Sequence, residues 1–186
     1  MEPPVAASID INNLSIGYFK GKKTISIGSL LNANARPGEL IALIGPNGVG
    51  KSTLIRSICQ LQPPLSGKVF INGNDSTKIS RNVIAKSISL VSTELYRASK
   101  LKVTDLVELG RFPHGNWFSG LSSVDKLIIQ ESLMQVNMSS LAQREITELS
   151  DGEYQRTMIA RALAQDTPIV LLDEPTAFLD MVNKFS

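Results

Sequence analysis

The sequence predicts an α/β fold with a mostly parallel central sheet, and three observations support that prediction. Two short apolar runs, 39–44 and 168–172, have the composition of buried strands. The segment 51–61 follows the first run directly and carries apolar residues at helical spacing. From about residue 94 to residue 151 the pattern changes to helical spacing with turn-rich links. This change predicts a small helical subdomain inserted into the α/β core.

Shorter elements are expected along the rest of the chain. Asn72-Gly73 after an apolar run is a tight-turn signal, and Asn12-Asn13 interrupts the alternation of the first strand. Pro63-Pro64 ends the helix that begins at Lys51. In chain order, the sequence predicts strands at 9–16, 25–27, 68–71 and 87–92, and helices at 82–86, 103–109, 124–136 and 151–165.

The composition excludes several classes of function. The 186 residues suit one domain, and 19 Lys and Arg stand against 17 Asp and Glu. The net charge of +2 does not indicate a basic surface that would bind nucleic acid. One Cys and one His exclude a disulfide framework and a metal site built from those residues alone. No signal peptide is recognisable and no apolar run reaches the ~18 residues that cross a bilayer. We therefore expect a cytosolic protein that contacts a membrane only through a partner.

The strongest chemical signal is the loop after the first apolar run. Gly45-Pro46-Asn47-Gly48-Val49-Gly50-Lys51-Ser52 satisfies the Walker A pattern G-x-x-x-x-G-K-[ST]. Glycines let consecutive N–H groups point at phosphate oxygens, and the helix that starts at Lys51 adds the positive end of its dipole. We expect Lys51 to span the β- and γ-phosphates of ATP, Ser52 to bind Mg²⁺ and Thr53 to reach the α-phosphate. A Gly-rich turn before a helix is the alternative, which the flanking elements disfavour.

A second signal lies at the end of the later apolar run, where Asp173 and Glu174 follow each other. A strand that delivers Asp173 at its carboxyl end fits a Walker B aspartate, which holds Mg²⁺. Glu174 is placed to polarise the attacking water as a general base. A strand that merely ends in acidic residues is common, so this interpretation depends on the Walker A loop before it.

A third motif separates the classes of nucleotide-binding protein. Leu149-Ser150-Asp151-Gly152-Glu153 stands between the Walker A loop and Asp173, and it resembles the LSGGQ signature of ABC ATPases. Ser150-x-x-Glu153 is also a capping box, which only starts a helix, and both interpretations can hold. The resemblance implies that the N–H groups here and the Ser150 hydroxyl bind the γ-phosphate of ATP held by the opposite subunit.

The order of the three motifs identifies the sequence as similar to the ATP-binding subunits of ABC transporters, from about Ile9 to the last residue. The resemblance implies a single ABC ATPase domain over 1–186 with a P-loop NTPase core (RecA-like, ABC-type). That core would span about 1–93 and 152–186, and the inserted helical subdomain about 94–151.

Weaker pieces of the resemblance concern single positions. Tyr18 resembles the aromatic residue that stacks on adenine, with a half-buried strand tyrosine as the alternative. Asp180 resembles the D-loop aspartate that couples the two ATP sites. The segment 107–114 is similar to the helical subdomain of the iron-chelate, haem and cobalamin importers. Within it, His114 is expected to be a solvated loop residue rather than a ligand.

Three features depart from the family pattern. Thr93, followed by Glu94, stands where a Q-loop glutamine is expected; threonine is too short to reach Mg²⁺, and Glu94 is a candidate substitute. Asp151 replaces a signature glycine and costs electrostatic energy near a phosphate unless it turns to solvent. The sequence ends at Ser186, before the switch histidine, a further strand and the helices of the family pattern, so we expect a fragment whose C-terminal part is missing.

The leading hypothesis is the ATP-hydrolysing subunit of an ABC importer, for iron chelates, haem or cobalamin. It would work as a homodimer with ATP and Mg²⁺ between Walker A and signature faces, and drive a transmembrane permease at the inner face of the cell membrane. The alternatives are a nucleotide-binding fragment without hydrolysis and a soluble ABC ATPase outside transport. The LSDGE segment disfavours a P-loop kinase. The transported substrate cannot be inferred, because the ATPase subunit does not touch it.

Overall fold

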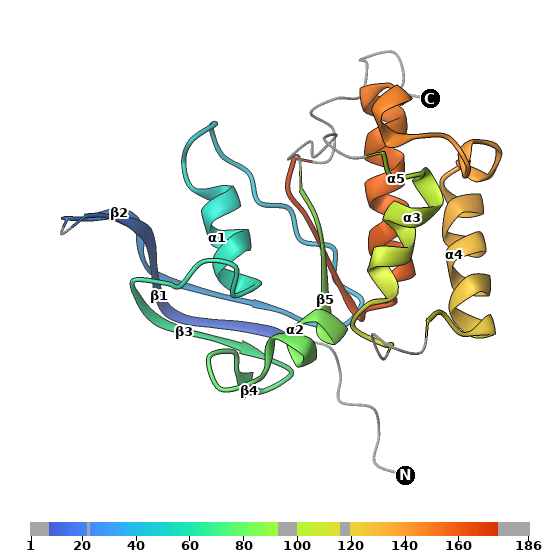
Figure 1. The fold of residues 1–186 in the computed structure, drawn as a ribbon. Coiled ribbons are helices and arrows are strands. Elements are labelled where there is room, and N and C mark those ends of the chain that lie inside the picture. The colour runs from blue at the N-terminus through green and yellow to red at the C-terminus, as the bar shows by residue number, and fades with distance from the viewer. Residues whose placement is uncertain (1–7, 22, 93–99, 116–119, 175–186) are drawn as a thin grey trace, which may run out of the picture. The chain divides into compact units, whose positions relative to one another are not determined.

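The computed structural model describes residues 8–21, 23–92, 100–115 and 120–174. They divide into two compact units, Met1–Ile88 and Ser89–Ser186 (Figure 1). The predicted core at about 1–93 and 152–186, with its helical subdomain at about 94–151, stays a prediction. No helix in the described ranges combines the length and the apolar composition that a membrane span requires.

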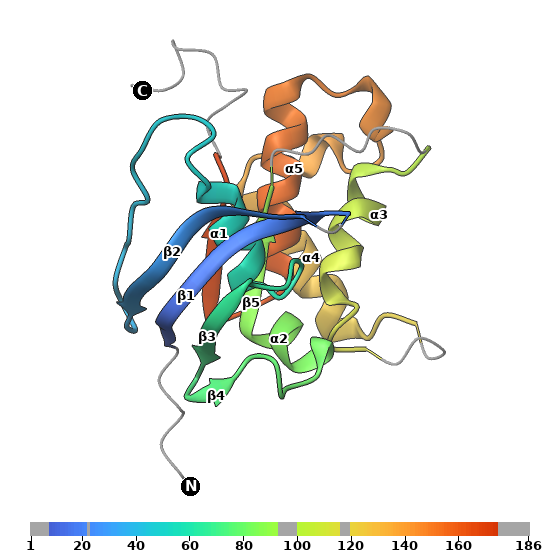
Figure 2. The ribbon, with the colours of Figure 1, turned by 90° about the vertical axis from the view of Figure 1, so that its left-hand side faces the viewer.

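The first unit is built on a four-stranded sheet in the order β2-β1-β3-β4 (Figure 2). Every pairing in this sheet is antiparallel, so the prediction of a mostly parallel sheet is wrong for these strands. For two of the pairs the reason is local, because only residues 21–22 separate β1 from β2 and only residues 72–73 separate β3 from β4. So short a connection can only join antiparallel strands. The strands are β1 (Ile9–Lys20), β2 (Lys23–Ala35), β3 (Ser66–Ile71) and β4 (Asn74–Asp75).

Two local signals in this unit have the expected outcome, but the helix that begins at Lys51 ends at Ile58 and does not extend to the predicted stop at Pro63-Pro64. Asn72 and Gly73 both have positive φ, as the tight turn between β3 and β4 requires. The register of β1 shifts after Ile11 and Asn13 has a φ of 47°, which confirms the interruption of this strand. The helix α1 (Lys51–Ile58) lies between β2 and β3 in sequence and packs against β1. The helix α2 (Arg81–Ser87) follows β4.

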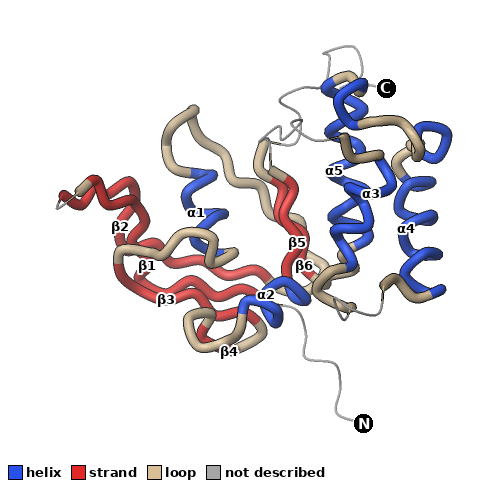
Figure 3. The backbone as a smooth tube through the Cα atoms, viewed as in Figure 1, coloured by secondary structure: helices blue, strands red, loops and turns tan. Residues whose placement is uncertain are grey.

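The predicted buried strand at 39–44 is wrong. This segment forms no strand and is drawn as loop before α1 in Figure 3. Leu40 is 99% exposed and Ile44 94% exposed. A strand needs a hydrogen-bonded neighbour, and none of the described strands pairs with this segment. The apolar composition of this segment predicted burial, but burial as a strand also requires a neighbouring strand, which composition alone does not indicate.

The second unit is a helical cluster with a two-stranded sheet, β5 (Ile88–Val91) and β6 (Ile169–Leu172). Its helices α3 (Val103–Glu108), α4 (Ser123–Gln135) and α5 (Asp151–Ala164) pack on one another (Figure 1). Three short 3-10 turns connect them: η1 (Leu109–Arg111), η2 (Ser139–Leu141) and η3 (Ile146–Glu148). Val91 of β5 belongs to the same apolar cluster as the three helices. The predicted helices and strands of this half of the chain are confirmed.

Candidate nucleotide-binding site

The predicted phosphate loop is a left-handed turn that runs directly into α1. Gly48 and Gly50 have φ values of +81° and +107°, a region that side chains with a Cβ rarely adopt. A Cβ on Gly50 would also overlap the side chain of Ile27. The N–H of Val49 donates to the carbonyl oxygen of Pro46 at 3.4 Å. The glycines are therefore required by the backbone of this loop.

The start of α1 favours an anion. Gly50 is the N-cap and contributes no capping side chain, and the first turn of the helix contains no acidic residue. The positive end of the helix dipole is thus not offset by a local carboxylate. The Lys51 ammonium lies at the loop, where its Nζ donates to the carbonyl oxygens of Gly45 and Pro46 at 3.0 and 3.1 Å. Ser52 and Thr53 are partly buried in the same turn.

Tyr18 lies in the same unit as the loop. It pairs with Ile25 across the β1–β2 ladder, and its side chain is 47% exposed. Tyr18 is therefore a half-exposed strand tyrosine with ring surface open to solvent. That geometry is compatible with stacking on adenine, which stays a prediction.

The predicted signature forms the N-terminus of α5 in the second unit. The Ser150 Oγ accepts from the Glu153 N–H at 3.3 Å, while Glu153 Oε2 accepts from the Ser150 N–H at 2.8 Å and from its hydroxyl at 2.7 Å. The hydroxyl of Ser150 is the main reason that the pKa of Glu153 is lowered. Leu149 is buried in the helical cluster and Asp151 is exposed. The capping-box interpretation is confirmed, and the phosphate-binding one stays a prediction.

Asp173 and Glu174 follow β6 in very different environments. Asp173 is only 5% exposed, and its N–H donates to the carbonyl oxygen of Val91 at 2.9 Å, which continues the pairing of β6 with β5. Glu174 is exposed and has a φ of 50°. Such a backbone conformation is uncommon for a residue with a side chain and recurs at functional positions. A buried carboxylate beside an accessible one suits the two roles predicted for them.

Sequence and fold now point to one family. The family model described as ABC transporter matches residues 29–177, which include the loop, the signature and Asp173. The chain belongs to the ABC transporter family. Its fold is α/β, the P-loop NTPase fold of the ABC cassettes. A dimeric ATP-binding cassette, solved in a post-hydrolysis state with ADP and Pi, superposes with a TM-score of 0.80 at 28% identity, over 94% of this chain and 77% of that one.

Two curated relatives are close in sequence. An uncharacterised ABC transporter ATP-binding protein of Methanocaldococcus jannaschii is 41% identical, over 92% of this chain and 58% of its own length. The iron(3+)-hydroxamate import ATP-binding protein of Bacillus subtilis is 39% identical, over 95% of this chain and 64% of its own length. The chain therefore spans about three fifths of the length of these ABC relatives.

Several predicted residues of the ABC site lie outside the described part of the chain. They are Thr93 and Glu94 at the Q-loop position and Asp180 of the D-loop. Of the described residues, Tyr18 and Gly45 to Thr53 belong to the first unit, and the signature, Asp173 and Glu174 to the second.

The donors present fit the metal that ABC cassettes use. Mg²⁺ takes one or two protein oxygens together with substrate phosphates and keeps several waters. The Ser52 hydroxyl and the buried Asp173 carboxylate are oxygen donors of this kind.

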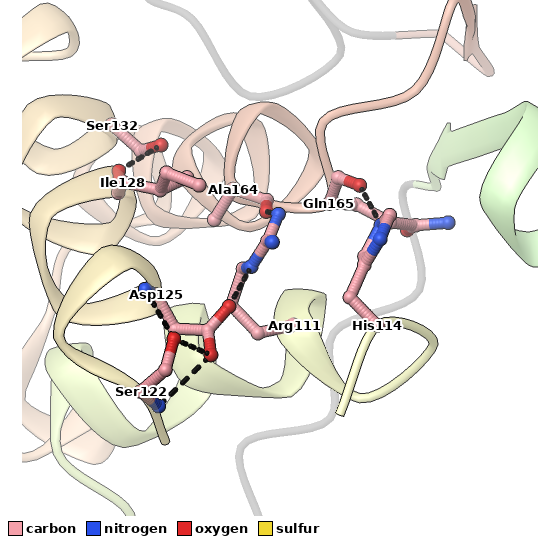
Figure 4. Close-up of polar contacts among 8 residues, drawn as sticks. All are labelled: Arg111, His114, Ser122, Asp125, Ile128, Ser132, Ala164 and Gln165. Carbon is pink, nitrogen blue, oxygen red and sulfur yellow. Dashed lines mark hydrogen bonds and ion pairs between the residues drawn. The ribbon is translucent and has the colours of Figure 1, made fainter. Parts of the chain in front are cut away.

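Two polar features of the second unit were missed by the sequence analysis. Arg111 is buried and forms an ion pair with Asp125 (Figure 4). The Ser122-x-x-Asp125 capping box was a readable signal for the start of α4, but nothing local predicts the arginine that joins it. Gln155 is 1% exposed, and within the described structure neither amide atom of its side chain has a hydrogen-bond partner.

Proposed function

We propose that this chain is the ATP-binding and ATP-hydrolysing part of an ABC importer that takes up iron chelates, haem or cobalamin. The observation that carries the proposal is the glycine loop that leads into an α1 whose first turn is free of acidic residues. The importer class is supported by the iron(3+)-hydroxamate import protein to which the chain is similar.

In the binding step, the loop gathers the triphosphate of ATP. The amides of Gly45 to Ser52 and the α1 dipole attract the phosphates. Lys51 leaves the carbonyl oxygens of Gly45 and Pro46, which it contacts now, and spans the β- and γ-phosphates instead. Thr53 reaches the α-phosphate, and the exposed ring of Tyr18 stacks on adenine.

For hydrolysis, Ser52 and Asp173 would hold Mg²⁺, and the ion would supply positive charge that neutralises charge developing on the phosphates. Thr93 or Glu94 would complete this environment from the Q-loop position. Glu174 accepts a proton from the attacking water, for which its exposed carboxylate is accessible.

The working unit of the proposal is a homodimer bound to a transmembrane permease. Leu149 to Glu153 of one subunit would bind the γ-phosphate of ATP held by the other, and Asp180 would couple the two sites. The similar ATP-binding cassette solved as a dimer with ADP and Pi supports this arrangement. The permease would place the subunit on the inner face of the cell membrane, and nucleic acid has no part in it.

The decisive experiment compares nucleotide binding and phosphate release in three variants. Lys51→Ala should abolish binding of a fluorescent ATP analogue, whereas Lys78→Ala removes one exposed lysine of the same unit and should leave binding intact. Glu174→Gln should bind normally and release no phosphate. Normal turnover by Glu174→Gln would show that the general base is assigned wrongly.

One observation favours a second candidate, a nucleotide-binding chain without turnover. The Ser150 hydroxyl is engaged by the carboxylate of Glu153, and Asp151 adds a second carboxylate to this turn of α5. Both charges oppose a phosphate at the signature. Tight ATP binding with no phosphate release above the Lys51→Ala background would favour this candidate over hydrolysis.

A further inference from the structure

The segment from Gly110 to His114 lies against the C-terminal end of α5 (Figure 4). A Cβ on Gly110 would overlap the carbonyl oxygen of Arg161, so glycine allows η1 to approach the backbone of α5 closely. This segment carries the resemblance to chelate importers in the sequence, and the proposed chemistry leaves it without a role.

Two consecutive carbonyl groups at the end of α5 are bonded by side chains of this segment. Arg111 Nη1 donates to the carbonyl oxygen of Ala164 at 2.8 Å, and His114 Nε2 lies 2.8 Å from that of Gln165. The last carbonyls of a helix have no partner within the helix, and a cation there complements the negative end of the dipole. Arg111 and His114 therefore act together as a cap for α5.

Arg111 also reaches the start of α4. Its Nε donates to Asp125 Oδ1 at 2.8 Å, and the two side chains are only 7% and 14% exposed. Asp125 in turn accepts from the N–H and the hydroxyl of Ser122 at 3.0 and 2.6 Å. Hydrogen bonds from Ser122 and then from Arg111 lower the pKa of Asp125 to about 2. One guanidinium thus joins η1, the first turn of α4 and the last turn of α5.

The position of this junction in the chain connects it to the proposed chemistry. α5 begins at the signature residue Ser150, and only residues 165–168 separate its end from β6, which delivers Asp173. Arg111 and His114 bind the carbonyl oxygens of Ala164 and Gln165, and directly after these residues the chain leaves α5 and continues to β6. A shift of the end of α5 would therefore move the start of β6.

We propose that Arg111 is a positioning residue, which fixes the end of α5 against α4 and thereby sets the position of Asp173 and Glu174 for hydrolysis. The proposal rests on the proposed ATPase function. Buried ion pairs add little net stability but are costly to break, so the pair with Asp125 defines geometry more than it adds to stability.

The first test separates catalysis from binding. Arg111→Met should lower kcat for ATP about tenfold or more and leave KM within about twofold, because small misplacements of catalytic groups cost rate rather than affinity. Arg111→Lys keeps the charge without the planar fork and should recover part of kcat. Arg144→Met removes an arginine from the exposed pair with Glu148 in the same unit and should change neither constant. An unchanged kcat in Arg111→Met would overturn the proposal.

The second test does not need hydrolysis, so it distinguishes failure of this proposal from failure of the ATPase function. Amide hydrogen exchange of the full chain should accelerate much more at residues 165–173 in Arg111→Met than at 103–108, whose acceleration reports only the loss of global stability. Asp125→Asn, which keeps the shape of the side chain, should show the same pattern if Arg111→Met does not fold. Equal acceleration at 165–173 and 103–108 would indicate a merely structural role, and no acceleration at 165–173 would also refute positioning.

Discussion

The two units differ in how completely they cover their apolar side chains. In the second unit Val103, Val107 and Met138 are fully buried among the three helices. In the first unit β1 and β3 bury a core of their own, yet the segment that enters the phosphate loop exposes Leu40 and Ile44 almost completely. Helices that are capped locally can close around one another, whereas a strand is complete only when another strand lies beside it. The loop proposed to bind nucleotide is therefore the end of a segment without such a neighbour among the described strands.

The largest expected effect is on the free energy of unfolding, and it tests the difference in burial between the two units. Met138→Ala should lower the free energy of unfolding by about 3 kcal/mol, because it removes a fully buried side chain and leaves a cavity. Leu40→Ala should change it by less than about 0.5 kcal/mol, because its side chain is exposed before and after the change. Urea unfolding of both variants would measure the difference. Equal losses would mean that Leu40 is covered in solution.

A smaller effect is expected for the loop itself. Gly50→Ala should destabilise the first unit by about 1–3 kcal/mol and weaken nucleotide binding, because the new side chain meets both positive φ and the side chain of Ile27. Gly38→Ala is the matched control, since Gly38 has a φ of +78° and its Cβ position has no described atom within 4 Å. Binding of a fluorescent nucleotide and urea unfolding should show the larger loss for Gly50. Equal losses would assign the effect to backbone strain alone.

Features that depend on residues close together in the sequence could be predicted from it, whereas features that depend on distant contacts could not. The helix starts at Ser122 and Ser150 were readable, because a capping box involves residues three apart. The turn at Asn72-Gly73 was readable for the same reason. The prediction of a strand at 39–44 is wrong because a buried strand needs a neighbouring strand, and the composition of a segment does not show whether it has one. The contact of Arg111 with Ala164 joins residues far apart in the chain, and no local sequence pattern predicts it.

The acid dependence of the second unit should report the Arg111–Asp125 pair. Asp125 has a folded pKa of about 2, below its ordinary value of 3.8, so its contribution is present above about pH 4 and is lost as the pH falls toward 2. Asp125→Asn should remove about 1–2 kcal/mol of unfolding free energy at pH 7 and much less at pH 2. Asp166→Asn, at an exposed aspartate of the same unit, should leave the pH profile unchanged. A pH-independent loss in Asp125→Asn would show that the carboxylate charge is not involved.

The smallest expected effect concerns Gln155, a buried polar residue of the second unit. Gln155 buries an amide whose two polar atoms have no hydrogen-bond partner in the described structure, so the folded state bears the cost of their desolvation. Gln155→Leu keeps a similar volume and removes that cost, and should leave the free energy of unfolding unchanged or raise it by up to about 1 kcal/mol. Gln155→Ala leaves a cavity and should lower it, which separates packing from polarity. A clear loss of stability in Gln155→Leu, measured by urea unfolding, would mean that the amide is hydrogen-bonded in solution and that the helical unit holds a polar contact at this position of α5.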